Sequence, residues 1–177
     1  MTAAGAAAPG APVLPLVLIG PMGAGKSRVG QKLAAEIAAP FVDTDARIVE
    51  RYGPIEEIFA REGEEYFRIV EREIVAEALA EEAVVSLGGG AVLHPATRID
   101  LAELPVVWLQ VSAAAVAPRL AGSARPLIAQ GGIDAWTRIR DERAPIYASL
   151  ADLAIDTSRR SVARIVTDIT ERFGGTA

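Results

Sequence analysis

Short apolar segments alternate with longer helical patterns along this chain. Five segments are brief and rich in branched residues, as buried parallel strands are, at 16–19, 41–42, 84–87, 106–111 and 153–155. Helical patterns cover 31–38, 64–82 and 162–173, and in the second of these apolar residues recur every three or four positions. The alternation predicts an α/β fold with a five-stranded parallel sheet between two helical layers, a three-layer α/β/α sandwich.

Length and composition narrow the class of protein. The 177 residues suit one domain, which we place at 16–177, after a tail at 1–15 that we expect to be disordered. That tail lacks the basic segment and the unbroken apolar run of a signal peptide. A net charge of -5 argues against nucleic acid or an anionic membrane as partner. The absence of cysteine excludes disulfides, thiol nucleophiles and cysteine-bound zinc. We expect a soluble, cytoplasmic protein.

The most specific motif follows the first predicted strand. In "GPMGAGKS", Gly20, Gly25, Lys26 and Ser27 match the pattern G-x-x-x-x-G-K-[ST]. Backbone N–H groups can surround a phosphate only where no Cβ intervenes, and the N-terminus of the next helix adds partial positive charge. Lys26 can then meet the β- and γ-phosphate oxygens, and Ser27 can bind Mg²⁺. Because strand, loop and helix all fall where the motif requires them, we predict a nucleotide site and not an incidental glycine turn.

Two aspartates follow the second predicted strand. Strand alternation would place Asp43 and Asp45 on one face, roughly 6 to 7 Å apart, which is too far for both to chelate one small ion. One could hold Mg²⁺ through water while the other accepts a proton from a substrate hydroxyl. The alternative is that one of them caps a helix that starts near Ala46.

Three further patterns each allow two interpretations. Arg68 precedes Glu71 by three helical positions, which could be a simple intrahelical ion pair. The glycines at 88–90 could form a turn or allow a ligand close to the backbone. Arg125 lies in a glycine-bounded segment, 119–132, which could be a mobile lid or an ordinary surface loop.

These motifs together resemble the shikimate kinase family from residue 17 to residue 173. The matching stretches are "GPMGAGKS", "DTD", "FR" followed by "E", "SLGGGAV", "RPL" and "ERAPIY", in that order. The resemblance implies a P-loop NTPase-type fold with substrate-binding helices and a lid at about 119–132. It also implies a monomeric enzyme that uses ATP and Mg²⁺ to phosphorylate the 3-hydroxyl of shikimate in aromatic amino-acid biosynthesis, with no nucleic-acid or membrane partner.

The resemblance also assigns roles to matching residues. Ser27 would bind Mg²⁺ directly and Asp43 would help through water. Asp45, Lys26 and Arg125 would be catalytic, with Asp45 deprotonating the hydroxyl that attacks. The nucleotide would contact Gly23, Ala24, Gly25, Lys26, Ser27, Arg28, Arg119, Arg125 and Arg160. Shikimate would contact Asp45, Arg68, Gly88, Gly89, Gly90 and Arg143. The planar guanidinium groups of Arg68 and Arg143 suit the carboxylate of shikimate.

Two other functions share part of this pattern. A sugar-acid kinase such as gluconate kinase would have the same phosphate loop and a different acceptor pocket. The second is a regulatory nucleotide-binding protein that has lost catalysis. The presence of Lys26, Ser27, Asp43 and Asp45 argues against this function.

The histidine and the tryptophans receive no catalytic role. His94 precedes a proline in an expected surface turn. Trp108 and Trp136 are predicted to pack in the core, as tryptophans in apolar segments usually do.

Overall fold

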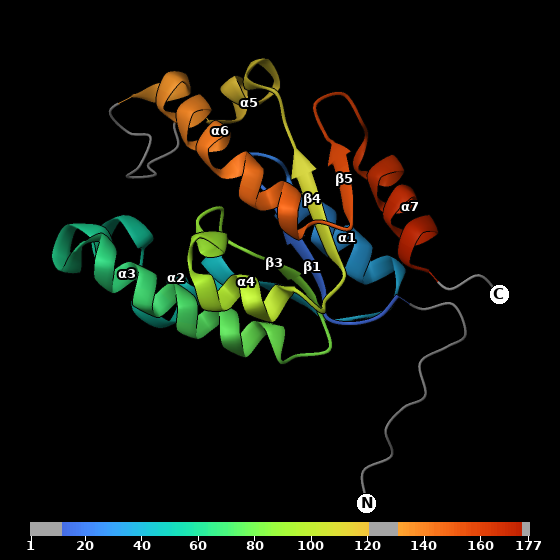
Figure 1. Cartoon of the computed structure of the whole chain (residues 1–177), viewed down its shortest axis with the longest axis horizontal. Helices are drawn as coiled ribbons and strands as arrows, with labels where there is room; N and C mark the ends of the chain where they lie inside the picture. The colour runs from blue at the N-terminus through green and yellow to red at the C-terminus, as the bar shows by residue number, and fades with distance from the viewer. Residues whose placement is uncertain (1–11, 121–130, 175–177) are drawn as a thin grey trace, which may run out of the picture.

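A five-stranded parallel sheet forms the centre of the protein (Figure 1). The computed structural model describes residues 12–120 and 131–174. The strands are β1 (Leu16–Ile19), β2 (Phe41–Asp43), β3 (Val84–Ser86), β4 (Val106–Gln110) and β5 (Leu153–Asp156). Their order across the sheet is β2-β3-β1-β4-β5, and every neighbouring pair is parallel. The predicted strand set is therefore confirmed.

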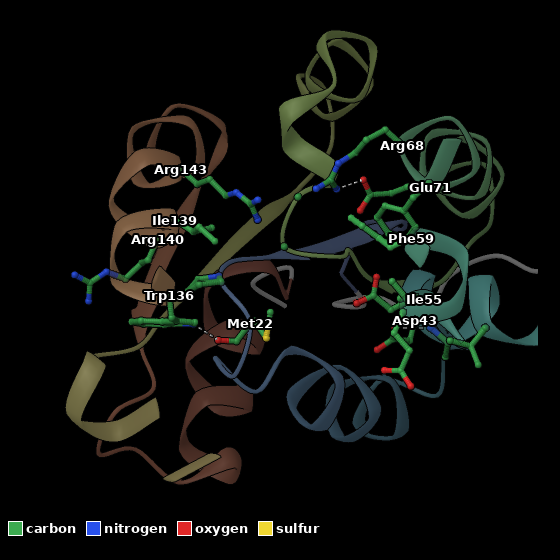
Figure 2. A pocket seen from close by; sticks show the side chains of 18 of the residues that line it. Met22, Asp43, Ile55, Phe59, Arg68, Glu71, Trp136, Ile139, Arg140 and Arg143 are labelled. Carbon is green, nitrogen blue, oxygen red and sulfur yellow. Dashed lines mark hydrogen bonds and ion pairs between the residues drawn. The ribbon is translucent and has the colours of Figure 1, made fainter. Parts of the chain in front are cut away.

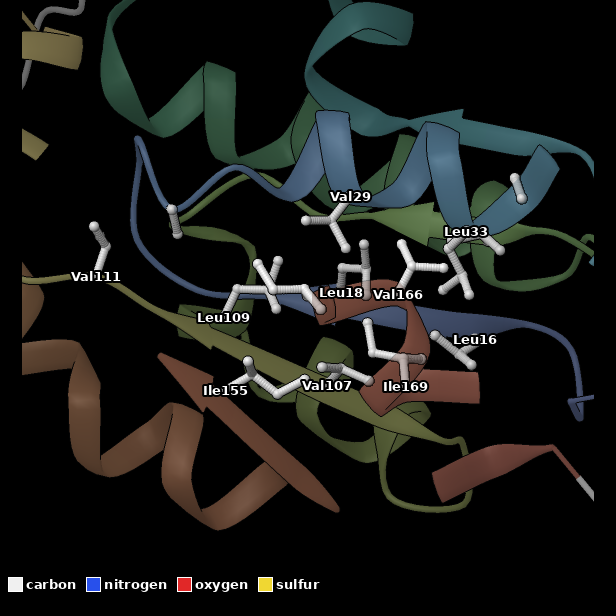
Figure 3. Close-up of a cluster of buried hydrophobic side chains, with 14 of the residues drawn as sticks. Leu16, Leu18, Val29, Leu33, Val107, Leu109, Val111, Ile155, Val166 and Ile169 are labelled. Atoms are coloured by element: carbon white, nitrogen blue, oxygen red, sulfur yellow. The ribbon is translucent and has the colours of Figure 1, made fainter. Parts of the chain in front are cut away.

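One face of the sheet is covered by the helices α1 (Lys26–Glu36) and α7 (Val162–Phe173). Leu16 and Leu18 of β1 point to this side and join a cluster with apolar residues of both helices (Figure 3). All residues of β1 are buried, because a central strand of a parallel sheet packs on both faces.

The opposite face is covered by α3 (Ile55–Leu79), α4 (Pro95–Leu101) and α6 (Gly132–Leu150). Val17 and Ile19, the alternate residues of β1, pack into this second cluster. The two clusters give the predicted three-layer sandwich. The remaining helices are α2 (Thr44–Tyr52), η1 (Ala91–Leu93) and α5 (Ala113–Leu120).

Several helix boundaries differ from the sequence prediction. The helix predicted at 31–38 is α1, which begins earlier, directly at the phosphate loop. The helix predicted at 64–82 is α3, which begins at Ile55 and continues through a kink at Gly63. That glycine has φ 84° and ψ 174°, and it interrupts the apolar pattern from which the helix was predicted. Only the helix predicted at 162–173 has the observed bounds.

Two residues shortly before β1 contact the folded part. Pro12 is buried, and Leu14 packs against the cluster under α1 and α7. Residues 1–11 lie outside the described part of the chain, as does most of the predicted lid at 119–132, including Arg125. Within 12–120 and 131–174, no helix combines the length and apolar character needed to cross a bilayer.

Candidate active site

The phosphate loop joins β1 to α1 as the motif predicts. Gly25 is the N-cap residue of α1 with φ 90° and ψ 18°, a left-handed conformation that glycine adopts without a steric penalty. The Lys26 ammonium curls back over the loop and donates to the carbonyl oxygens of Gly20 at 2.8 Å and Pro21 at 3.1 Å. Ser27 and Arg28, in the first turn, are exposed. The helix N-terminus and the lysine thus lie together at the loop, with the ammonium group bonded to two loop carbonyls.

Side chains from α5 and from the segment after β5 form hydrogen bonds with the backbone of this loop. Arg119 at the end of α5 donates to the Gly23 carbonyl at 2.9 Å. The buried Thr157 hydroxyl, just after β5, lies 2.9 Å from the Ala24 carbonyl oxygen. Sequence reasoning missed Thr157, because only the sheet order brings the end of β5 to this loop. Arg160 is exposed and pairs with Asp168 of α7 at 2.6 Å.

Ser27 and Asp43 meet beside the loop. The Ser27 hydroxyl donates to Oδ2 of Asp43 at 2.5 Å, while Oδ1 of Asp43 accepts from the Ala46 N–H at 3.1 Å. Asp43 therefore caps α2 and also approaches Ser27. The predicted strand alternation was wrong, since β2 ends at Asp43 and Asp45 already lies in the first turn of α2. The start of the helix, not the pleat, brings both carboxylates to the adjoining pocket.

The residues around this pair fit a magnesium ion. Mg²⁺ usually takes only one or two protein oxygens and fills its octahedron with water and substrate phosphates. Ser27 and Asp43 present such oxygens at the edge of the phosphate loop. Among the described residues there is no cluster of three or more His, Cys, Asp or Glu side chains that would enclose a metal without substrate.

A pocket of about 570 Å³ opens beside the phosphate loop (Figure 2). One wall comes from α2 and α3 and carries Asp45, Phe59 and Arg68. The other wall is α6, where Arg143 points toward the centre of the pocket while the Arg140 guanidinium turns away from it. The pocket therefore combines apolar surface with charges of both signs.

Three side chains of the pocket converge on the glycines at 88–90, which follow β3. A Cβ added at Gly88 would lie 2.5 Å from Oδ1 of Asp45, and one at Gly90 would lie 2.3 Å from Nη1 of Arg68. A Cβ at Gly89 would lie 3.7 Å from Nη1 of Arg143. The absence of a Cβ at Gly88 and Gly90 therefore makes room for the side chains of Asp45 and Arg68.

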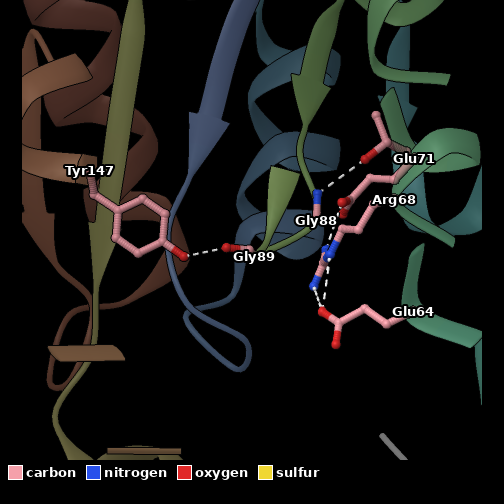
Figure 4. Close-up of polar contacts among 7 residues, drawn as sticks. Glu64, Arg68, Glu71, Gly88, Gly89 and Tyr147 are labelled. Atoms are coloured by element: carbon pink, nitrogen blue, oxygen red, sulfur yellow. Dashed lines mark hydrogen bonds and ion pairs between the residues drawn. The ribbon is translucent and has the colours of Figure 1, made fainter. Parts of the chain in front are cut away.

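Arg68 is held by two glutamates. Its guanidinium donates to Glu71 at 2.6 Å and to Glu64 at 3.0 Å (Figure 4), so the predicted intrahelical pair exists and lines the pocket. Burial raises the pKa of the Glu71 carboxyl; Arg68 opposes this rise, and Asp45 adds to it. Burial disfavours the charge of Arg68, but its bonds to the glutamates outweigh that and leave its pKa raised.

The aromatic residues of α6 contact both glycine-containing loops. The Tyr147 hydroxyl donates to the Gly89 carbonyl at 2.5 Å, and burial raises the pKa of Tyr147 to about 12, so it remains a donor at neutral pH. The Trp136 indole N–H donates to the Met22 carbonyl at 2.9 Å. Trp136 is buried as predicted, yet it also lines the pocket, which the packing interpretation missed.

The other two residues without a predicted catalytic role lie outside this pocket. His94 is exposed, and its Nδ1 accepts from the Ala96 N–H at 3.1 Å as the cap of α4. Trp108 of β4 packs against Tyr147 with ring centroids 5.9 Å apart.

The chain resembles known proteins in sequence and in fold. The family model "Shikimate kinase" matches residues 22–173. A shikimate kinase of Mycobacterium avium is 43% identical over 164 residues, covering 90% of this chain and 93% of that protein. The solved structure of an Acinetobacter baumannii shikimate kinase in complex with shikimate superposes with a TM-score of 0.84 at 30% identity, covering 89% of this chain and 90% of that chain.

A gluconokinase of Sinorhizobium meliloti has the same fold, with a TM-score of 0.60 at 23% identity over 94% of each chain. That likeness concerns the fold alone, whereas the range matched by the shikimate kinase family model, 22–173, includes Lys26, the glycines at 88–90 and both pocket arginines. The chain belongs to the shikimate kinase family.

Proposed function

We propose that this protein transfers the γ-phosphoryl group of ATP to the 3-hydroxyl of shikimate. The observation that carries the proposal is the convergence of Asp45, Arg143 and Arg68 on three successive glycines beside the phosphate loop. A carboxylate acceptor would meet an aspartate beside the first of these glycines and guanidinium groups beside the second and third.

The charge and shape of the pocket support shikimate as the acceptor. Arg68 and Arg143 stand on opposite walls of the pocket and can bind one carboxylate with planar, forked hydrogen bonds. Asp45 lies over Gly88, where it can orient a hydroxyl and take its proton as the oxygen attacks. Phe59 and Ile139 add apolar surface that suits the carbon ring of shikimate.

The phosphate loop supports ATP as the phosphoryl donor. The backbone of 23–28 would surround the phosphates, with the Lys26 ammonium leaving its present carbonyl partners to meet the β- and γ-oxygens. Arg119, already 2.9 Å from the Gly23 carbonyl, and Arg160 would flank the nucleotide, and Arg125 would approach the transferred group. Such transfer depends on positioning and on charge neutralisation more than on covalent catalysis.

Magnesium would be held by Ser27 directly and by Asp43 through water. When bound, it would neutralise charge on the nucleotide phosphates. The hydrogen bond between Ser27 and Asp43 supports this assignment, because it shows that both oxygens reach the same point. We further infer a cytoplasmic monomer without nucleic-acid or membrane partners, in keeping with the net charge of -5.

An acceptor panel tests the proposal. Purified protein with ATP and Mg²⁺ is assayed for ADP release with shikimate, with gluconate and without acceptor. We expect release that depends on shikimate. Release that depends on gluconate would favour the sugar-acid kinase, and nucleotide binding without release under any condition would favour a regulatory protein.

A further inference from the structure

Helix α6 carries two aromatic side chains that bind the backbone of two different loops of the site. The Trp136 indole N–H donates to the Met22 carbonyl of the phosphate loop (Figure 2), and the Tyr147 hydroxyl donates to the Gly89 carbonyl of the glycine triplet (Figure 4). Both side chains are almost completely buried, with 2% and 1% exposed. Each end of the pocket-facing part of α6 is therefore fixed to a loop.

The residues between these two anchors form the pocket wall. Ile139 and Arg143 continue the spacing of three and four positions from Trp136 to Tyr147, so all four lie on one face of the helix. Arg143 is one turn before Tyr147 and adjoins the same glycine, since a Cβ at Gly89 would lie 3.7 Å from its Nη1. The direction of Arg143 thus depends on how α6 sits against Gly89.

The two loops also touch each other at this point. A Cβ at Gly89 would lie 3.5 Å from the Gly20 carbonyl oxygen and 3.6 Å from the Met22 nitrogen. Helix α6 therefore spans the junction between the loop that binds phosphate and the loop that faces the acceptor. A shift of the helix would change the distance and the angle between donor and acceptor.

The N–H group of Trp136 and the O–H group of Tyr147 form directional hydrogen bonds that packing alone does not require. Phenylalanine would fill most of either space, whereas the N–H and O–H groups fix a direction and a distance to one carbonyl each. Trp108 provides a contrast: its indole nitrogen is buried and has no hydrogen-bond partner among the described residues. Its ring packs against Tyr147.

We propose that Trp136 and Tyr147 are positioning residues that align Arg143 and the phosphate loop with the glycine triplet. The proposal rests on the proposed function, in which Arg143 binds the carboxylate of shikimate. It assigns Tyr147 to the acceptor side alone and Trp136 to both sides, because Met22 belongs to the phosphate loop and also lines the pocket.

The test measures kcat and both KM values for Tyr147→Phe and Trp136→Phe. Loss of one hydrogen bond predicts a rise of about 2- to 10-fold in the KM for shikimate in Tyr147→Phe, with the KM for ATP unchanged. In Trp136→Phe both KM values should rise. A purely structural role would instead lower the active fraction, which reduces the maximal rate and leaves both KM values unchanged.

One control variant and one double variant sharpen the result. Tyr66→Phe, at a partly exposed position of α3, removes the same hydroxyl group away from Arg143 and should keep both KM values. If Tyr147 acts through Arg143, its effect on the KM for shikimate should be smaller in the Arg143→Lys background than in the wild type.

Each outcome has a defined meaning. Unchanged KM values in both phenylalanine variants, or fully multiplicative effects of Tyr147→Phe and Arg143→Lys, would overturn the positioning role and leave the proposed function intact. A wild-type protein that does not phosphorylate shikimate would overturn both. Because the two aromatics are tested separately, a variant that fails to fold leaves the other to decide.

Discussion

Replacing Gly90 with alanine should weaken shikimate binding, chiefly by displacing Arg68. Gly90 has φ -96° and ψ -8°, which alanine adopts without strain, so the backbone need not move. The new Cβ would lie 2.3 Å from Nη1 and 2.9 Å from Cζ of Arg68, so the guanidinium must withdraw by roughly 1 Å to reach ordinary contact.

The expected magnitude follows from the bonds that this withdrawal disturbs. Arg68 is tied to Glu71 at 2.6 Å and would also bind the substrate carboxylate. A hydrogen bond to a charged group contributes about 1.5 to 3 kcal/mol, so losing the substrate bond should raise the KM for shikimate about 10- to 100-fold. The KM for ATP should stay close to that of the wild type, because Arg68 lies on the acceptor wall.

Steady-state kinetics on Gly90→Ala measures both constants, and Gly30→Ala is the matched control. A Cβ at Gly30 would lie 2.3 Å from Cε2 of Phe41, a comparable clash against an apolar ring away from the pocket. Gly30→Ala should therefore lower the melting temperature without changing the KM for shikimate. A Gly90→Ala protein with an unchanged KM for shikimate would refute the placement of Arg68 against the substrate.

The remaining predictions concern charge. Arg143→Lys keeps the cation but loses the planar fork, so calorimetric titration should show weaker shikimate binding and nearly unchanged ATP binding; unchanged shikimate affinity would reject the assignment. Lys26→Ala should lower kcat on the order of 10² to 10³, and full activity in the folded variant would reject its phosphate role. Asp43→Asn should regain part of its activity with extra Mg²⁺, whereas Asp45→Asn should not, because an amide cannot take the proton; equal rescue of both would show that the roles are misassigned. Burial raises the pKa of the Glu71 carboxyl in the folded protein. The protonated carboxyl therefore stabilises the folded state below the ordinary pKa of a glutamate, and this contribution is lost as the pH rises through the raised pKa. The melting temperature of the wild type relative to Glu71→Gln should therefore fall as the pH rises above about 4.5, the ordinary pKa of a glutamate, and a rise would contradict the sign.

Local signals were sufficient for the sheet and the phosphate loop. A buried strand, a glycine-rich turn and a helix N-terminus lie within a few residues of one another, so the motif around Lys26 determines its own geometry. The sequence pattern failed at Asp43 and Asp45, because strand and helix meet there without a linker and the cap of α2 replaces the pleat.

Contacts between distant elements could not be predicted in this way. Helix α6 was not predicted, since its site-facing side mixes aromatic and cationic residues and the helix contains Pro145. The bonds from Trp136 to Met22 and from Thr157 to Ala24 join residues more than a hundred positions apart, and only the sheet order places them together. Such contacts depend on tertiary structure and leave no local signal in the sequence.

The most direct test of the central claim is to identify the product by ³¹P NMR after incubation of the wild-type protein with ATP, Mg²⁺ and shikimate. Asp45 beside the first glycine of the triplet and the two arginines beside the second and third should bind shikimate in one orientation. We therefore predict ADP and a single phosphate ester at the 3-hydroxyl. A phosphate ester at another hydroxyl, or inorganic phosphate without any ester, would contradict the account.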